Sequence, residues 1–122
     1  MRAVAPSFAL AAAAGPAAPR GNPIGGTFAN PGGCQRPSGA TQTTDEVAIL
    51  RSGGLEFHDS FCPITRLGVS DGALTRIEAA CSGEGERWTV VYAAEPLPAG
   101  AGHVLVPERF PDVRIELRKC AP

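Results

Sequence analysis

Short hydrophobic runs alternate with turn signals from Glu46 to the end of the chain. The runs are rich in β-branched and aromatic residues, and clusters of Gly, Pro, Asp or Ser separate them. No segment shows a convincing helical period. The pattern predicts an all-β fold, a small antiparallel meander that forms a barrel or a sandwich of about six to seven strands. The runs lie at residues 46–50, 55–61, 62–69, 73–81, 86–95, 103–106 and 113–119, and residues 24–29 could hold one more short strand.

The strongest hairpin signal is the Asp71-Gly72 pair, which stands between two alternating runs. If these two residues form the turn, the numbers of facing residues sum to 143. Val69 then faces Leu74, and Arg66 faces Ile77. This register fixes which side chains share a face of the hairpin.

The same register places Cys62 opposite Cys81, which predicts a disulfide between the two strands. The remaining cysteines, Cys34 and Cys120, would then form a second bridge that ties the N-terminal segment to the last strand. A zinc site normally shows close pairs of cysteines, whereas the spacings here are 28, 19 and 39 residues. Four free buried thiols are the other alternative. We therefore favour two disulfides, with a one-residue bulge beside Pro63 that adjusts the local pairing.

That bulge would also bring the apolar side chains on both sides of it to the inner face of the sheet. Trp88 alternates with Val90 and Tyr92, so we expect Trp88 and Tyr92 to form the wall of a possible pocket. The residues predicted for the core are Phe57, Phe61, Ile64, Ile77, Trp88, Val90 and Ile115.

The first 14 residues have a basic start at Arg2, an uncharged stretch and small residues at a cleavage position near Ala14, which is the form of a secretory signal peptide. The alternative is a disordered Ala/Pro-rich tail. Residues 15–45 form a Gly/Pro-rich arm with one short strand, and residues 46–122 form an antiparallel β domain, so that one globular domain spans about 24–120. An even number of cysteines beyond the leader supports export, and we expect a periplasmic or secreted protein.

The composition excludes some partners. The formal net charge is -1, and no basic patch or stripe suggests binding to nucleic acid. No apolar run approaches the ~18 residues that a transmembrane helix requires. We find no motif for a cofactor or a metal ion, and the oligomeric state is not encoded in any pattern that we recognise.

His58, Asp59 and Ser60 are the three residue types of a hydrolase triad, placed side by side. We interpret them as part of a strand, in which neighbouring side chains point to opposite faces and cannot form a triad among themselves. The only other histidine is His103, and no G-x-S-x-G motif is present. We therefore assign no catalytic residue and expect that the protein is not an enzyme.

Gly26-Thr27-Phe28, followed by Cys34, resembles the Gly-x-Trp opening of lipocalin-like barrels, with Phe28 in place of the tryptophan. The stretches LEFHDSFC and CSGEGERW and the terminal RKC resemble small exported bacterial β-barrel proteins of unknown function. The resemblance covers Gly26 to Cys120 loosely. It implies a barrel fold and an exported location, and it carries over no ligand and no catalytic residue.

Two functions remain in view. The first is a small exported β-barrel binding or inhibitory module with a pocket near Trp88 and Tyr92, whose partner is an unknown small molecule or protein. The second is a structural or envelope-associated interaction protein with a filled core and no ligand. An open barrel mouth or an exposed apolar patch would favour the first, and a closed, filled interior the second.

Overall fold

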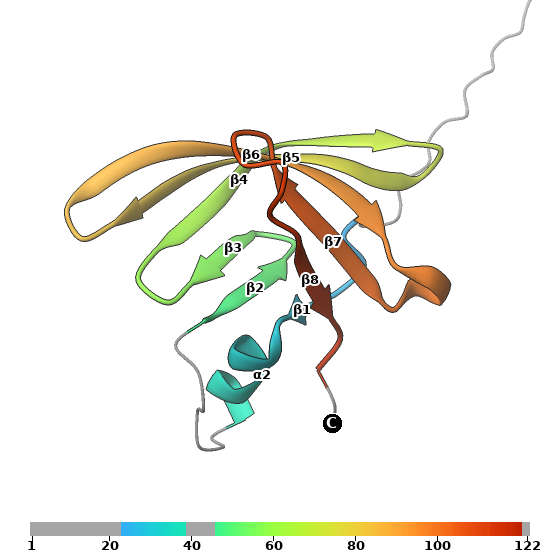
Figure 1. Cartoon of the computed structure of the whole chain (residues 1–122), viewed down its shortest axis with the longest axis horizontal. Helices are drawn as coiled ribbons and strands as arrows, with labels where there is room; N and C mark the ends of the chain where they lie inside the picture. Colours follow the sequence, from blue (N-terminus) through green and yellow to red (C-terminus); the bar gives the residue numbers. More distant parts are fainter. Residues whose placement is uncertain (1–22, 39–45, 121–122) are drawn as a thin grey trace, which may run out of the picture.

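Eight antiparallel strands close into a barrel in the computed structural model, which describes residues 23–38 and 46–120 (Figure 1). Each strand pairs with the next one in the chain, and β8 returns to pair with β1. The all-β prediction is confirmed, as a barrel rather than a sandwich, and the strands number eight instead of six to seven. The elements are β1 (Phe28–Ala29), α2 (Pro31–Ser38), β2 (Ala48–Arg51), β3 (Gly54–Phe57), β4 (Phe61–Ser70), β5 (Ala73–Gly83), β6 (Glu86–Pro96), the 3₁₀ turn η2 (Pro98–Gly100), β7 (Gly102–Pro107) and β8 (Ile115–Arg118).

Apolar side chains from every strand fill the interior of the barrel. Their removal from water is the main term that stabilises the fold. Of the residues predicted for the core, Ile77 is fully buried, whereas Phe61 and Trp88 are wrong because each is 40 % exposed. The other four predicted residues are half-buried and pack against the core, namely Phe57, Ile64, Val90 and Ile115. The largest fully buried side chains are Ile24, Leu50, Leu55, Leu74, Ile77, Leu105, Leu117 and Cys62.

Phe61 lies outside because residues 55–61 are not one strand. Strand β3 ends at Phe57, and β4 begins at Phe61 after a three-residue turn. Phe61 pairs with Glu56, so both side chains are on the outer face of the sheet. Its ring lies so close to Gly54 that a Cβ atom there would be 2.9 Å from the ring. The prediction carried one alternation through the turn and therefore placed this ring on the wrong face.

The Asp71-Gly72 turn is confirmed. Asp71 has φ 53° and Gly72 has φ 79°, the two positive values that a two-residue type I′ turn requires. Glycine adopts this conformation without steric cost, and aspartate is one of the few other residues that tolerate it. Val69 pairs with Leu74, as the register predicts.

The predicted pairing of Arg66 with Ile77 is wrong, because β4 and β5 carry two compensating bulges. Thr75 is an extra residue in β5, and the numbers of facing residues sum to 144 beyond it. Thr65 is an extra residue in β4 and restores the sum of 143. This second bulge takes the place of the one predicted beside Pro63. One bulge on each strand therefore leaves the register at the far end of the hairpin unchanged.

Both predicted disulfides are present. Cys62 is bonded to Cys81 with the Cα atoms 3.9 Å apart, and Cys34 is bonded to Cys120 with the Cα atoms 5.4 Å apart. The shorter distance is that of a non-hydrogen-bonded cross-strand pair, in which facing Cα atoms are about 4.5 Å apart rather than about 5.5 Å. The first bridge ties β4 to β5, and the second ties α2 to the end of the chain.

The helix α2 corrects the prediction that residues 15–45 contain only loop and one short strand. Asn30 caps this helix, since its Oδ1 accepts a hydrogen bond from the backbone N–H of Gly33 at 2.8 Å. Pro31 occupies the first helical position, where its missing N–H costs nothing. Gly33 is required by close packing, because a Cβ atom there would be 2.8 Å from the carbonyl oxygen of Ala48. The strand expected within 24–29 is present as β1.

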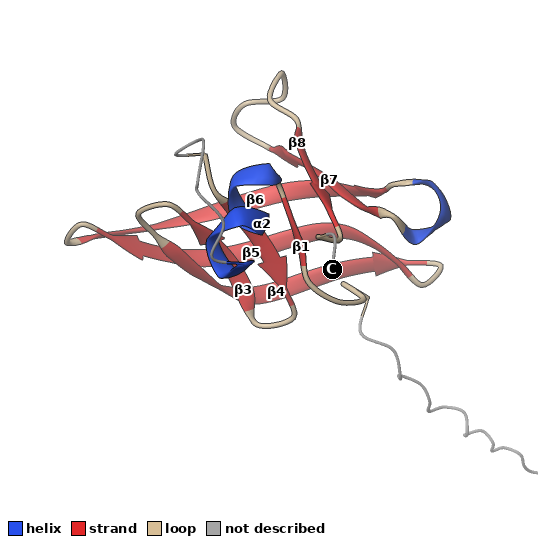
Figure 2. Cartoon of the chain, turned by 90° about the horizontal axis from the view of Figure 1, so that it is seen from below, coloured by secondary structure: helices blue, strands red, loops and turns tan. Residues whose placement is uncertain are grey.

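Helix α2 lies against the outside of the barrel beside β1 and β2 (Figure 2). A second, small apolar cluster fills the space between them. It consists of Ala29, Val47 and Ile49, with Cys34 and Cys120 packed against them. The disulfide therefore fastens a helix of low intrinsic propensity, which contains two glycines and an internal proline, to the barrel wall.

The predicted leader, with cleavage near Ala14, lies outside the described residues. Within the described ranges, no helix has the length and apolar character needed to cross a membrane.

Candidate binding site at one end of the barrel

One end of the barrel carries most of the exposed apolar surface. Strands β2, β4, β6 and β8 begin at this end, and β1, β3, β5 and β7 finish there. Five large hydrophobic side chains are exposed among the described residues, and only Val69 is at the opposite end. The other four define what we call the rim surface, namely Phe61, Trp88, Phe110 and Val113. A concentration of exposed apolar side chains at one end of a small protein often marks an interaction site.

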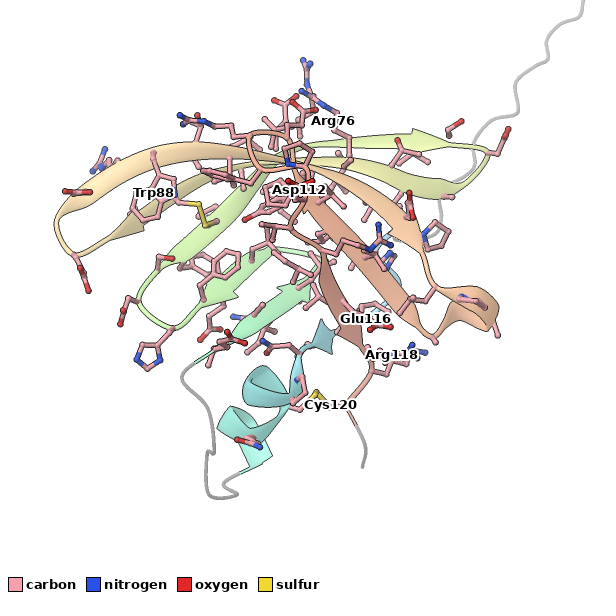
Figure 3. All side chains as sticks on the ribbon, in the orientation of Figure 1. Arg76, Trp88, Asp112, Glu116, Arg118 and Cys120 are labelled. Carbon is pink, nitrogen blue, oxygen red and sulfur yellow. A yellow bond between two sulfur atoms is a disulfide. The ribbon has the colours of Figure 1, made fainter. Side chains whose placement is uncertain are left out.

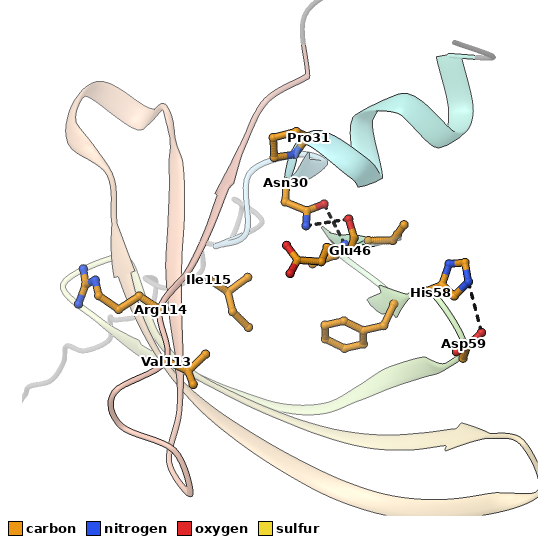
Figure 4. Close-up of a pocket in the computed structure, with 11 residues that line it drawn as sticks. Asn30, Pro31, Glu46, His58, Asp59, Val113, Arg114 and Ile115 are labelled. Atoms are coloured by element: carbon orange, nitrogen blue, oxygen red, sulfur yellow. Dashed lines mark hydrogen bonds and ion pairs between the residues drawn. The ribbon is translucent and has the colours of Figure 1, made fainter. Parts of the chain in front are cut away.

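A hollow of about 640 Å³ opens at this end, between the start of β2, the β3–β4 turn and the segment that leads into β8 (Figure 4). Ala48, Phe57 and Ile115 form an apolar floor that belongs to the barrel core. His58 and Asp59 lie on one side of the hollow, and Val113, Arg114 and Ile115 lie on the other.

Asn30 builds the upper wall of this hollow. Its Oδ1 accepts hydrogen bonds from the N–H of Gly33 in α2 and of Ala48 in β2, at 2.8 and 3.0 Å. Its Nδ2 donates to the carbonyl oxygen of Glu46 at 3.1 Å. The side chain is therefore occupied in joining the helix to the barrel, and we assign it a structural role.

His58, Asp59 and Ser60 form the turn between β3 and β4 and are not part of a strand, which corrects the interpretation from sequence. The turn closes with a hydrogen bond from the N–H of Phe57 to the carbonyl oxygen of Ser60, at 2.8 Å. His58 Nε2 is 3.6 Å from Asp59 Oδ1, and the two side chains are 47 % and 63 % exposed. In a hydrolase triad the acid is buried and holds the imidazole in a fixed orientation. This exposed pair does not have that arrangement.

A second hollow, of about 420 Å³, lies along strand β6 and includes both residues predicted as a pocket wall, Trp88 and Tyr92. Its wall contains every residue from Trp88 to Tyr92, together with Pro107 to Phe110. Because successive side chains of a strand point to opposite faces, a hollow that contacts five in a row lies along the edge of the strand. We call it the β6 groove.

Trp88 stands opposite Cys81 and therefore shares the inner face with the Cys62–Cys81 bridge (Figure 3). It is exposed because β7 reaches only as far as Tyr92, where Pro107 pairs with it. Beyond that point no strand of the described chain pairs with β6 on the side away from β5. The alternation from sequence gave the correct face for Trp88 but could not show that the barrel ends before it.

Tyr92 lies at the inner end of the β6 groove and is 7 % exposed. Burial raises the pKa of its phenol, because removal from water disfavours the charged form. The groove therefore passes from a half-exposed indole to a buried, neutral phenol ring.

The loop after β7 forms the other wall of the β6 groove. The N–H of Glu108 donates to the carbonyl oxygen of Val91 at 2.9 Å, and its carboxylate accepts from Arg76 Nε at 3.4 Å. Arg76 also pairs with Glu78, and hydrogen bonds first to Glu78 and then to Glu108 raise the pKa of the guanidinium. These contacts hold the loop beside β6 and place Phe110, which is 61 % exposed, at the groove.

The tip of the β5–β6 hairpin is acidic. A hollow of about 210 Å³ contacts the side chains of Asp59, Glu84, Glu86 and Trp88, and no basic residue lines it. Arg87 lies on the opposite face of β6 from Glu86, since the two are neighbours in a strand. Within the described residues, no group of three His, Cys, Asp or Glu side chains is placed to hold a metal ion.

His103 was considered only as a possible triad partner, and the structure places it in the core, 7 % exposed. Its Nε2 is 2.8 Å from the carbonyl oxygen of Ile24, and its ring meets Phe28 edge-on at a centroid distance of 4.8 Å. Nδ1 has no hydrogen-bond partner among the described residues. This histidine holds the segment at Ile24 against β7, at the end opposite to the rim surface.

Sequence analysis missed the loop between β7 and β8 as part of the candidate site. The available signal was Phe110, an aromatic residue between Arg109 and Pro111 in a segment otherwise polar or turn-forming.

Comparison of the chain with known protein families, with curated proteins and with solved structures finds no match.

Proposed function

We propose that this chain is a small exported binding module that engages its partner with the rim surface and the β6 groove. The observation that carries the proposal is the gathering of four exposed large hydrophobic side chains at one end of the barrel. Leaving such residues in water has a free-energy cost of about 1.5–3 kcal/mol for each side chain that could otherwise be fully buried. A partner that covers them would recover part of this free energy on binding.

The partner is better accommodated on the surface than inside the barrel. The interior is occupied by leucine, isoleucine and aromatic side chains from every strand. The hollows at the rim are lined by residues at strand ends and in loops. A surface that combines Trp and Phe with charged residues at its border has the composition of a protein-binding site.

The filled interior also favours the second function, a structural or envelope-associated interaction protein without a small ligand. The two proposals share a protein partner and differ in whether binding is the activity or only holds the protein in place. The exported location, with cleavage near Ala14, supports both. It rests on the leader pattern and on the two disulfides, which persist in oxidising compartments.

The export proposal is tested by mass spectrometry of the protein recovered from the periplasm or the medium. We expect a chain that begins near Gly15 with both disulfides formed. An intact Met1 on protein from the cytoplasmic fraction would contradict it.

The binding proposal is tested by placing a photo-reactive phenylalanine analogue at Phe110 or, as a matched control, at Val69. Both positions are exposed and apolar, but they lie at opposite ends of the barrel. After illumination in the native compartment, mass spectrometry identifies the cross-linked proteins. We expect one reproducible partner from position 110 and none from position 69. Equal yields from both positions would refute a binding surface at the rim.

A further inference from the structure

The outer half of β6 is an unpaired sheet edge. Strand β5 pairs with β6 over eight consecutive positions, from Gly83 with Glu86 to Arg76 with Ala93. Strand β7 pairs only with the inner half, from Tyr92 to Pro96. Residues 86–91 therefore have β5 on one side and no strand on the other, where the β6 groove lies beside residues 88–91.

The hydrogen-bonding groups of alternate residues on this edge point away from β5. The carbonyl oxygen of Val91 accepts a hydrogen bond from the loop residue Glu108, on the side away from β5. In an extended strand the N–H and C=O of one residue point to the same side, and the side alternates along the chain. The backbone groups of Thr89 and Arg87 therefore point to the same side as those of Val91. They have no backbone partner within the described residues.

This edge has no bulge and no proline to protect it, and its charged residues, Glu86 and Arg87, are confined to the hairpin tip. Its pairing with β5 contains no bulge, and residues 86–91 contain neither proline nor lysine. Unprotected, regular edges pair readily with a further strand. The adjoining groove supplies apolar contacts from Trp88 and Phe110, which are 40 % and 61 % exposed.

We propose that the free edge of β6 binds an extended segment of a partner protein, which adds a strand to the barrel sheet beside residues 86–91. This inference rests on the proposed function and specifies the kind of partner. Main-chain hydrogen bonds to Arg87 and Thr89 provide affinity, and an apolar side chain of the segment enters the β6 groove beside Trp88. Such β-strand addition is a common mode of peptide recognition.

The charges around the edge define the chemistry of the segment. Asp59, Glu84 and Glu86 surround the outer end of the edge, with no basic residue in that hollow. At the inner end the carboxylate of Glu108 is already paired with Arg76, which leaves Arg109 as the charge that lines the groove. The matching segment has a lysine or arginine toward the hairpin tip and apolar residues in its middle. An acidic or neutral residue faces Arg109.

The test uses the full chain and a phage-displayed library of linear twelve-residue peptides. Enriched peptides are synthesised, and their binding is followed by the fluorescence of Trp88, the only tryptophan. We expect enriched sequences in which apolar and polar residues alternate and a basic residue stands at one end. Failure to enrich any sequence, or enrichment of sequences that are acidic throughout, would overturn the inference.

The decisive variant is Thr89→Pro, which removes an N–H that no other part of the described chain uses. Its matched control is Val69→Pro on the free edge of β4. Val69 precedes the hydrogen-bonded pair that flanks the two-residue turn, so its N–H also points away from β5. We expect Thr89→Pro to weaken peptide binding about tenfold or more, as for a lost hydrogen bond and a blocked edge. Val69→Pro should leave binding within about twofold.

Two further measurements make the result unambiguous. Thermal unfolding establishes that both proline variants are folded. Trp88→Ala removes the apolar contact without changing the edge, and its binding is measured by the fluorescence anisotropy of a dye-labelled peptide, because this variant lacks the only tryptophan. Peptide binding that survives Thr89→Pro would overturn strand addition. If the partner cross-linked through position 110 still bound that variant, the proposed function would stand. Sedimentation that showed a dimer in the unmodified chain but not in Thr89→Pro would identify a second copy as the occupant and overturn the partner assignment.

Discussion

Strands β4 and β6 each have an unpaired edge among the described residues, and the two edges are similar in length but differ in how they are protected. The edge of β4 beyond Pro63 runs beside a ladder that is interrupted twice, at Thr65 and Thr75. The edge of β6 before Tyr92 runs beside a ladder with no interruption. Bulges twist a strand and disrupt the regular row of N–H and C=O groups with which a further strand would pair. The edge of β4 is therefore protected, and the edge of β6 is available for pairing. The difference in backbone regularity distinguishes a hairpin that only completes the fold from one suited to binding.

The side chains reinforce this difference. The β4 edge carries Arg66 and a single strongly exposed apolar residue, Val69. The β6 edge lies in a groove with Trp88 and Phe110 and is flanked by acidic residues. Both edges carry one arginine, Arg66 or Arg87, so the aromatic groove is the side-chain feature that favours association at β6.

The largest effect is expected from removing the disulfides. Cys62→Ala with Cys81→Ala should lower the free energy of unfolding by about 3 kcal/mol in the chain-entropy treatment. The bridge joins β4 to β5 where the β5–β6 hairpin leaves the barrel, so amide exchange should increase along residues 76–91. Hydrogen exchange and urea unfolding measure the two effects.

The second bridge provides the control. Cys34→Ser with Cys120→Ser opens a longer loop, with a sequence separation of 86 rather than 19. It should lower the free energy of unfolding by about 4–5 kcal/mol. It should loosen α2 and leave Cys62–Cys81 and the β6 edge intact. Equal loosening of β6 in both variants would show that the hairpin is not held by its own bridge, and would break the comparison.

The protection of the β4 edge is tested by deleting Thr65 and Thr75 together. The β4–β5 ladder then becomes regular, and Ile64, Leu67 and Ile77 keep their inward orientation, because the two extra residues compensate each other. We expect a change of about 1–2 kcal/mol in stability and, more importantly, new concentration-dependent association through the straightened edge. Sedimentation measures it. A monomer at all concentrations would show that the bulges do not protect this edge.

The inner end of the β6 groove is tested by pH. Burial raises the pKa of Tyr92, so the folded state holds the phenolic proton more tightly than the unfolded state, whose pKa is about 10. The contribution of protonated Tyr92 to the free energy of unfolding is therefore fully present below a pH of about 10, and it is lost as the pH rises through the pKa of the folded state. Tyr92 is the only tyrosine, so phenolate absorbance reports it alone. Tyr92→Phe should remove this part of the pH dependence of the free energy of unfolding. If the free energy of unfolding of the variant fell as steeply with rising pH as that of the unmodified chain, the assignment to Tyr92 would be wrong.

The smallest effect is expected from the loop beside β6. Glu108→Gln weakens the ion pair with Arg76, whose partners are 41 % and 52 % exposed, so the cost in stability should be at most about 1 kcal/mol. The loop should become more mobile at Phe110 and bind the selected peptides about two- to threefold more weakly, since more of it must be ordered on binding. Glu95→Gln, which affects the exposed pair with Arg114, is the matched control. Equal effects of the two substitutions on peptide binding would show that the ion pair between Glu108 and Arg76 has no specific effect on the β6 groove.

Local chemistry in the sequence determined the all-β class, the central hairpin and its disulfide. Asp71-Gly72 is recognisable because few residues accept positive φ, and this turn sets the register through backbone geometry alone. Cys62 and Cys81 therefore faced each other correctly in the prediction, although the bulges at Thr65 and Thr75 were not foreseen. The two bulges shift the register in opposite directions. The predicted pairing of Cys62 with Cys81 is therefore correct, although the predicted register between the bulges is wrong.

Only the tertiary structure decided where strands end relative to their neighbours. Helix α2 has the composition of a loop and exists because Asn30 caps it, Gly33 fits against β2 and Cys34 is bonded to Cys120. The exposure of Trp88 likewise depends on β7 stopping at Pro107, far away in the sequence. Periodicity reports which face a side chain occupies, but burial depends on whether another strand covers that face. For this reason the alternation placed Trp88 and Tyr92 on one face of a strand, while the groove and the free edge became visible only in the folded barrel.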